Sequence, residues 1–297
     1  MLMRSDVADL DRGYSRRLEL GKKLTGRGVL VWLTVGFGIM FVKVGVATLI
    51  ALSVAKFFGG DVFGLSTLAI LVAMSDTNGG MFMALTSAMG DKEDVGTYVP
   101  QSIETGPFLT MLILVGAGLA NIPWLTMVSV IAPIFVGAIL GNLDEDLRDF
   151  FGSHEAIIVP FMGFTLGQNI NLGNVVAAGP IGIALGLFVL VVSGFCCIVA
   201  DKLLGGTGIA GAAASSTAGN STAVPRAIAL ADPTYAAIAP VATVQVTASL
   251  IVTAVLTPLL TAWMYRKAQK EREAESVAAP PIVVEGVVAV ESASVKP

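Results

Sequence analysis

The chain has 297 residues, of which 55% are hydrophobic and 13% are charged, and its mean hydropathy is +0.80. This composition is too apolar for a soluble globular protein of this length, and it predicts an all-α integral membrane protein in a lipid bilayer. The net charge is −4 and no basic stripe with interleaved aromatic residues occurs, which excludes nucleic acid as a partner class.

The predicted elements begin after a polar, highly charged segment, 1–27, which we expect to be a cytoplasmic basic leader and not a cleaved signal peptide. Uncharged stretches of about 20 residues follow, each long enough to cross a membrane as a helix. They predict about eight transmembrane helices at 28–57, 64–89, 105–122, 123–141, 156–175, 179–200, 207–230 and 236–264. Basic residues beyond the first and last spans place both termini in the cytoplasm. Residues 268–297 are predicted to be a cytoplasmic, disordered tail.

The predicted helices group into two triplets, 28–122 and 179–267, with a pair of helices at 123–178 between them. In each triplet a span that contains Gly and Asn residues precedes a span that a proline opens, Pro100 in the first and Pro240 in the second. The first interrupted span runs inward and the second runs outward. The sequence therefore predicts an inverted repeat, which is typical of secondary transporters.

Two polar interruptions divide otherwise apolar spans, Ser75–Gly80 and Ser216–Ser221. Within a membrane, such backbone is tolerated where protein or a water-filled cavity satisfies its amides and carbonyls. Free N–H groups at a helix break suit a carboxylate, and unwound carbonyls suit a cation. We therefore expect a binding site for an anionic solute at Thr77, Asn78, Gly79, Gly80, Thr217, Gly219, Asn220 and Ser221. The alternative is that these small residues permit close helix crossing.

Two carboxyl groups accompany the first interruption. Asp76 lies near the middle of its span, where it either exchanges protons during transport or stays ionised and caps free amides. Glu104 lies at the start of the next span. If it is buried against the first break, it is a second proton-coupling carboxylate, flanked by Ser102 and Thr105. If it lies at the membrane interface, it is an ordinary acidic residue at a helix start.

Two other polar residues lie inside or near predicted spans. Gln168 is near the outer end of 156–175, where it either faces the substrate cavity or belongs to a solvated helix end. Lys43 is the cation that lies well inside a span. It either pairs with a buried carboxylate or binds the anionic solute, since snorkelling to the interface is less available at mid-depth.

Several enzyme classes are excluded by what the sequence lacks. His154 is the sole histidine and falls in an acidic loop, so no histidine is available to activate Ser215, Ser216 or Ser221 as a nucleophile. No GxxxxGK[ST] phosphate loop occurs, so we expect no nucleotide hydrolysis. We therefore predict a protein that is not an enzyme and that needs no cofactor or metal.

Several motifs resemble the bacterial 2-keto-3-deoxygluconate permease family over roughly residues 28–268. They are Gly64–Ala69 through Thr77–Gly80, Ser102–Pro107, Gly141–Asp144, Ala200–Lys202, and Gly208–Gly211 through Ala214–Ser216. The run from Thr77 to Pro107 is the most specific part. The resemblance implies proton symport of 2-keto-3-deoxygluconate, a sugar acid, across the inner membrane.

That family is similar in architecture to the bile-acid/sodium symporter superfamily. Its members have ten helices in two inverted repeats, with two broken helices that cross in a core domain and a panel domain that moves against the core. By this likeness the crossing is Thr77–Gly80 with Ala218–Ser221, the triplets are the core, and 123–178 is a remaining panel pair. Family members carry two further N-terminal panel helices, which we expect this chain to lack.

The leading hypothesis is therefore a proton-coupled importer of a sugar acid that works by alternating access around the two breaks. Two alternatives stay open. One is a sodium-coupled symporter of organic anions, whose uptake would follow sodium and not pH. The other is a truncated membrane subunit that does not transport. The sequence does not determine the oligomeric state.

Overall fold

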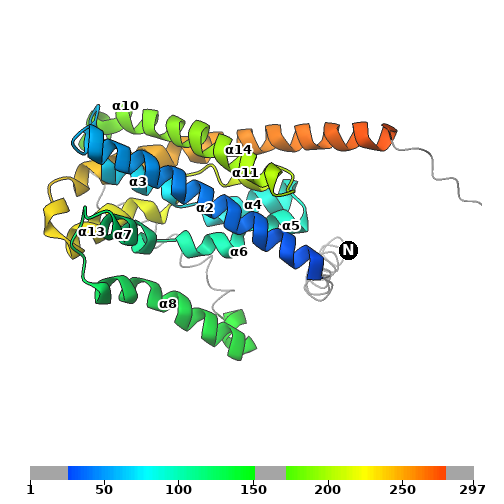
Figure 1. The fold of residues 1–297 in the computed structure, drawn as a ribbon, viewed down its shortest axis with the longest axis horizontal. Helices are drawn as coiled ribbons and strands as arrows, with labels where there is room; N and C mark the ends of the chain where they lie inside the picture. The colour runs from blue at the N-terminus through cyan, green and yellow to red at the C-terminus, as the bar shows by residue number, and fades with distance from the viewer. Residues whose placement is uncertain (1–25, 151–171, 279–297) are drawn as a thin grey trace, which may run out of the picture.

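The computed structural model describes residues 26–150 and 172–278, whose regular elements are helices apart from one short β-hairpin (Figure 1). The elements of the first half are α2 (Gly26–Phe57), β1 (Asp61–Val62), β2 (Leu65–Ser66), α3 (Thr67–Ser75), α4 (Gly79–Met89), α5 (Lys92–Gly96), α6 (Tyr98–Gln101), the 3-10 helix η1 (Ser102–Glu104), α7 (Pro107–Gly116) and α8 (Trp124–Leu143). The antiparallel hairpin pairs Asp61 with Ser66 and Val62 with Leu65.

The regular elements of the described second half are all helical. Its elements are α10 (Leu172–Phe188), the π-helix η2 (Val189–Ser193), α11 (Gly194–Leu203), α12 (Ile209–Ala213), η3 (Asn220–Ala223), α13 (Val224–Ala231), η4 (Pro233–Tyr235) and α14 (Ala239–Ala278). In Figure 1, α2, α10 and α14 form long rods, while α8 lies apart from them beside the rest of the bundle. Helix α14 continues beyond the bundle and past residue 268, where the predicted tail begins.

Five helical segments among the described residues are long and apolar enough to cross a membrane: Trp32–Phe57, Thr67–Met89, Trp124–Leu143, Gly179–Leu203 and Ala239–Glu271. They coincide with five of the eight predicted spans. Predicted span 105–122 contains the ten-residue helix α7, and 207–230 is divided among α12, η3 and α13. Predicted span 156–175 lies largely outside the described residues. The described residues therefore form a multi-pass helical membrane protein without confirming the count of eight.

The first proline of the predicted repeat does not open a span. Pro100 lies inside the short helix α6, and the 3-10 helix η1 and a glycine with φ of 91° separate it from α7. Helix α7 begins at Pro107, whose missing N–H is not needed at a first helical position. Pro240, by contrast, lies in the first turn of α14, as predicted.

Helix α3 is the centre of the fold, because all nine of its residues are buried. Its sequence, TLAILVAMS, is apolar on every side, which is typical of a helix enclosed by other helices. Helices α2, α10, α13 and α14 pack around it. The apolar cluster around Leu68, Leu71 and Met74 is therefore the core that positions the chain where α3 ends.

Helices α10 and α14 pack closely through small residues on α10. A Cβ atom at Gly182 would lie 2.5 Å from Cβ of Ala248 and 3.0 Å from the carbonyl oxygen of Gln245. One turn later, a Cβ atom at Gly186 would lie 2.7 Å from Cβ of Val252. The four-residue spacing of these glycines is the small-residue pattern that brings membrane helices into backbone contact.

We therefore predict that Gly182→Ala destabilises the protein by about 1–3 kcal/mol, because the added methyl group forces α10 away from α14. Thermal unfolding of the purified protein in detergent measures the effect. Gly179→Ala is the matched control on the same helix, since no atom lies within 4 Å of a Cβ atom built there. Equal stability of the two variants would contradict the close packing.

A polar contact joins the connection between α7 and α8 to the turn after α13. The backbone N–H of Asn121 donates to Oδ2 of Asp232 at 2.7 Å, and the hydroxyl of Tyr235 donates to the carbonyl of Leu119 at 2.8 Å. The N–H and hydroxyl of Thr234 donate to Oδ1 of Asp232. These donors, that of Asn121 first, hold the pKa of Asp232 below its ordinary value.

A lowered pKa in the folded protein gives stability that is present above the unfolded pKa, about 3.9, and is lost as the pH falls through the folded value. We therefore expect Asp232→Asn to lower the unfolding temperature at pH 7. The difference from the wild type should shrink as the pH falls below about 4. If the unfolding temperatures of the wild type and of Asp232→Asn differ by the same amount at pH 7 and below about pH 4, the ionised carboxylate contributes nothing to stability.

Candidate functional site

The first helix break separates α3 from α4. Asp76 follows the last residue of α3 in an extended conformation, with φ of −126° and ψ of 142°, so the helix cannot continue through it. Asn78 then caps α4, and its side-chain oxygen accepts the N–H of Met81 at 3.1 Å. The predicted interruption at 75–80 is thus a real break, and it spans residues 76–78.

The second break follows α12, which ends at Ala213. Residues 214–219 continue without helix to η3. Ser215, Ser216 and Thr217 lie in this segment, and all three are completely buried. Because buried polar groups require hydrogen-bond partners, the partners of this segment define what it does.

Lys43 of α2 joins the two breaks. Its buried ammonium donates to the carbonyl oxygen of Asp76 at 2.9 Å and to Oγ1 of Thr77 at 2.8 Å. It also donates to the carbonyl oxygens of Ala214 at 2.7 Å and Ser216 at 2.9 Å. Asp76 and Ala214 are the C-caps of α3 and α12, so the ammonium lies at two helix ends that favour positive charge.

The chain also links the two breaks without Lys43. The N–H of Asn78 donates to Oγ of Ser216 at 3.1 Å. The hydroxyl of Thr217 donates to the carbonyl of Ala73 at 2.9 Å and lies 2.8 Å from Oγ of Ser249. The carbonyl of Ala73 is in the last turn of α3, where the helix supplies no partner. The two breaks therefore form one hydrogen-bonded unit.

Asp76 and Glu104 are buried beside this unit, with 3% and 2% of their surface exposed. Oδ2 of Asp76 accepts the N–H of Gly106 at 3.2 Å and the hydroxyl of Ser221 at 3.3 Å. Oδ1 of Asp76 and both carboxyl oxygens of Glu104 are buried without a hydrogen-bond partner. Glu104 interacts electrostatically with Lys43 and Asp76. Burial thus places Glu104 in the protein interior and not at an exposed helix end.

The other predicted site residues differ in accessibility. Asn78 and Gly79 at the start of α4 are partly exposed, and Gly80 is exposed. Gly219 and Asn220 are partly exposed as well. These residues therefore lie at the accessible side of the breaks, while Thr77, Thr217 and Ser221 are buried.

Two predicted coupling residues and one predicted binding residue remain. The hydroxyl of Ser102 donates to the carbonyl of Val99 at 2.7 Å and not to the carboxyl group of Asp76 or Glu104. Oγ1 of Thr105 is buried without a partner, next to Glu104 in the sequence. Gln168 lies outside the described residues.

Sequence reasoning missed a stripe of polar residues on α14. Gln245, Ser249, Thr253, Thr257 and Thr261 recur every four residues and are all buried. The hydroxyl of Thr253 accepts the N–H of Thr217 at 3.1 Å, and that of Thr257 donates to the carbonyl of Ser215 at 3.1 Å. The four-residue period on an apolar helix was the available signal, because it puts all five side chains on one face.

Sequence reasoning also missed the partners of Lys43. The sequence predicted a carboxylate or an anionic solute. Lys43 does interact electrostatically with Glu104 and Asp76, but the hydrogen bonds of its ammonium run to three carbonyl groups and one hydroxyl group. Carbonyl groups occur at every residue, so no residue type marks them as a lysine site.

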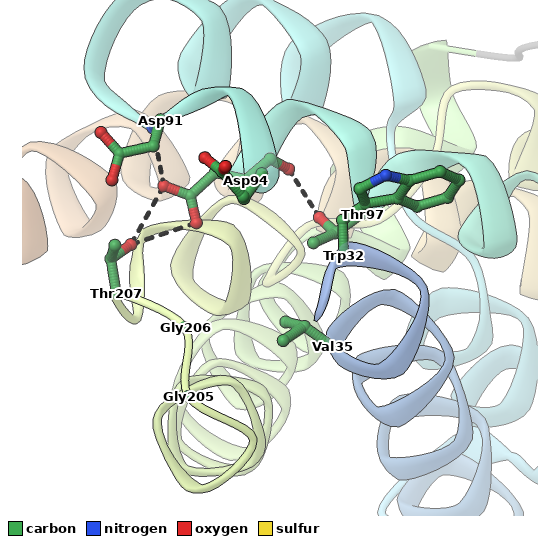
Figure 2. A pocket seen from close by; sticks show the side chains of 9 residues that line it. Trp32, Val35, Asp91, Asp94, Thr97, Gly205, Gly206 and Thr207 are labelled. Carbon is green, nitrogen blue, oxygen red and sulfur yellow. Dashed lines mark hydrogen bonds between the residues drawn. The ribbon is translucent and has the colours of Figure 1, made fainter. Parts of the chain in front are cut away.

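A separate pocket of about 260 Å³ lies where the start of α2 meets α5 and the loop before α12 (Figure 2). The carboxylate of Asp94 points at Thr207, whose hydroxyl lies 3.1 Å from each carboxylate oxygen. Oδ2 of Asp94 also accepts the N–H of Asp91 at 2.8 Å. The residues that line this pocket are outside the predicted binding and coupling sites. Asp94 ties the segment after the first break to the segment before the second.

Comparison with known proteins gives a consistent result over most of the chain. The sequence model of the 2-keto-3-deoxygluconate permease family matches residues 17–270. The chain is 48% identical over 241 residues to 2-keto-3-deoxygluconate permease 1 of Salmonella typhimurium, covering 81% of this chain and 76% of that protein. It is 41% identical over 244 residues to 2-keto-3-deoxygluconate permease of Bacillus subtilis, covering 80% and 74%. No solved structure matches the chain.

The bond between Thr217 and Ala73 gives a stability prediction. We expect Thr217→Val to destabilise the protein by about 1–2 kcal/mol, because it leaves the carbonyl of Ala73 buried and unpaired. Thr247→Val is the control, since that hydroxyl donates to the carbonyl of Thr243 within its own helix. If thermal unfolding in detergent shows no difference between the variants, the link between the breaks does not stabilise the fold.

Proposed function

Because the chain belongs to the 2-keto-3-deoxygluconate permease family, it is a membrane transporter and not an enzyme, and we propose that it imports 2-keto-3-deoxygluconate by proton symport across the bacterial inner membrane. The observation that carries the proposal is the division of the two breaks into an accessible polar side and a buried charged side. The accessible side suits the solute, and the buried side suits the proton.

The solute site is proposed at the start of α4. The N–H groups of Gly79 and Gly80 belong to the first turn of this eleven-residue helix, which supplies no internal partner for them. Positive helix-end charge and free N–H groups bind a carboxylate, such as that of a sugar acid. The side chains of Asn78 and Asn220 are partly exposed and offer amides to the hydroxyl and keto groups.

The proton site is proposed at Asp76 and Glu104. These two carboxyl groups and Lys43 are buried together, and an unbalanced charge in such a place is costly. One ammonium balances one carboxylate, so the second carboxyl group is favoured in its protonated, neutral form. A proton shared by the two groups is then the coupled ion, which leaves when the site opens to the cytoplasm.

Transport is proposed to occur by alternating access, in which the two breaks form the fixed centre. Both termini are proposed to lie in the cytoplasm. The hydrogen bonds that join the breaks support this assignment, because a binding site made from two discontinuous helices needs a common frame. The inverted arrangement of the two triplets and their role as a core belong to the same proposal.

The solute site is tested by uptake of labelled 2-keto-3-deoxygluconate into proteoliposomes. We expect Asn78→Ala to weaken uptake about 10-fold or more, as loss of a hydrogen bond to a charged solute predicts. Asn142→Ala is the matched control, since Asn142 is exposed and its amide donates to the carbonyl of Ala138 in the same helix. Full uptake by Asn78→Ala would contradict the proposed solute site.

The proton site is tested in the same vesicles with an imposed pH gradient. We expect wild-type uptake to follow the gradient and Glu104→Gln to lose that dependence, while exchange of labelled for unlabelled solute persists. Glu145→Gln is the control, because the side chain of Glu145 is 87% exposed. Uptake that follows a sodium gradient at constant pH would overturn proton coupling, and pH-driven uptake by Glu104→Gln would overturn the role of Glu104.

A further inference from the structure

The surroundings of the Lys43 ammonium have the composition of a site for a metal cation. Four oxygen atoms lie 2.7–2.9 Å from Nζ, two from each break. Three of them are backbone carbonyl oxygens and the fourth is the hydroxyl oxygen of Thr77. Uncharged carbonyl and hydroxyl oxygens at unwound helix segments are the ligands that bind sodium in transporters built from broken helices.

We propose that Lys43 supplies the resident cation of a monovalent cation site formed by the two breaks. The ammonium occupies the position that a free sodium ion would take, and it is tied to α2 by its own side chain. The protein therefore needs no sodium for the integrity of its breaks. Removing the ammonium while leaving the oxygen atoms in place creates a sodium site. This assignment concerns the breaks alone and holds whichever solute is carried.

The hydrogen-bond geometry indicates that the ammonium of Lys43 acts through its positive charge more than as a directed hydrogen-bond donor. An ammonium has three N–H groups, yet four oxygen atoms surround this one, so at least one N–H is shared between two acceptors. Such an arrangement is governed by the positive charge at the centre more than by the direction of each bond. The carbonyl ends of α3 and α12 both converge on that charge.

The oxygen cage is held by contacts that do not include Lys43. Ser216 remains bonded to Asn78, Thr217 to Ala73 and Ser249, and the carbonyl of Ser215 to Thr257. Backbone carbonyls also keep their place when a neighbouring side chain is shortened, because the chain path fixes them. A shortened residue 43 therefore leaves a cavity lined by oxygen atoms, and not a collapsed gap.

Electrostatics gives a further reason for a cation at this place. Asp76 and Glu104 interact with Lys43, and their unpartnered carboxyl oxygens are buried nearby. Without the ammonium, the carbonyl oxygens present negative potential that no cation balances, and any of these carboxyl groups that stays ionised adds to it. A small monovalent cation that enters the vacated space restores the balance.

The test measures thermal unfolding of the purified full chain in detergent, with sodium chloride replaced stepwise by choline chloride at a constant ionic strength of about 0.15 M. Choline is too large for the vacated space, so it reports the effect of ionic strength alone. We expect Lys43→Ala to unfold at a temperature roughly 2–4 °C higher in sodium than in choline. The wild type should show no difference between the two salts.

Two further variants separate the site from side effects of the substitution. Lys43→Met fills the space with an uncharged chain, and we expect it to be destabilised without a response to sodium. Lys56→Ala removes an exposed lysine from the same helix and should behave as the wild type does. The proposal is overturned if Lys43→Ala is equally stable in both salts or if sodium stabilises the wild type. It is also overturned if Lys43→Ala fails to fold in both sodium and choline.

Discussion

The structure depends on one interaction, in which the ammonium of Lys43 binds oxygen atoms from two helix breaks that are far apart in the sequence. Each break leaves carbonyl groups without helical partners inside an apolar environment, where an unpaired carbonyl is costly. The ammonium binds carbonyl oxygens of both breaks together, and it adds to the direct hydrogen bonds that join the breaks. Helix α3 is buried on every side, and its end places the first break beside the ammonium of Lys43.

The same interaction organises charge across the site. The cation lies on the buried side of the breaks with Asp76 and Glu104, and the partly exposed start of α4 lies on the other side. Under the proposed function, a sugar acid and a proton occupy neighbouring but distinct places, and each changes the charge balance around the other. In this account, coupling follows from electrostatic balance around a fixed ammonium and needs no direct contact between solute and proton.

The sequence predicted the parts of this arrangement that residue types encode. Membrane helices follow from apolar length, and the breaks follow from Gly, Asn and Thr within apolar runs, within about two residues of their observed places at 76–78 and 214–219. The partners of Lys43 were missed because carbonyl oxygens have no sequence signature. The span at 207–230 was predicted to be interrupted, but hydropathy does not reveal that Ser215 and Thr217 find hydrogen-bond partners on α14.

The central claim is that Lys43 stabilises both breaks at once within the unit that they form, and hydrogen–deuterium exchange of the wild type and of Lys43→Met tests it most directly. The account predicts that backbone amides in both 76–80 and 214–221 exchange faster in the variant, and that they do so together, while those in the hairpin at 61–66 are unchanged. Faster exchange in one break alone, or in neither, would contradict it.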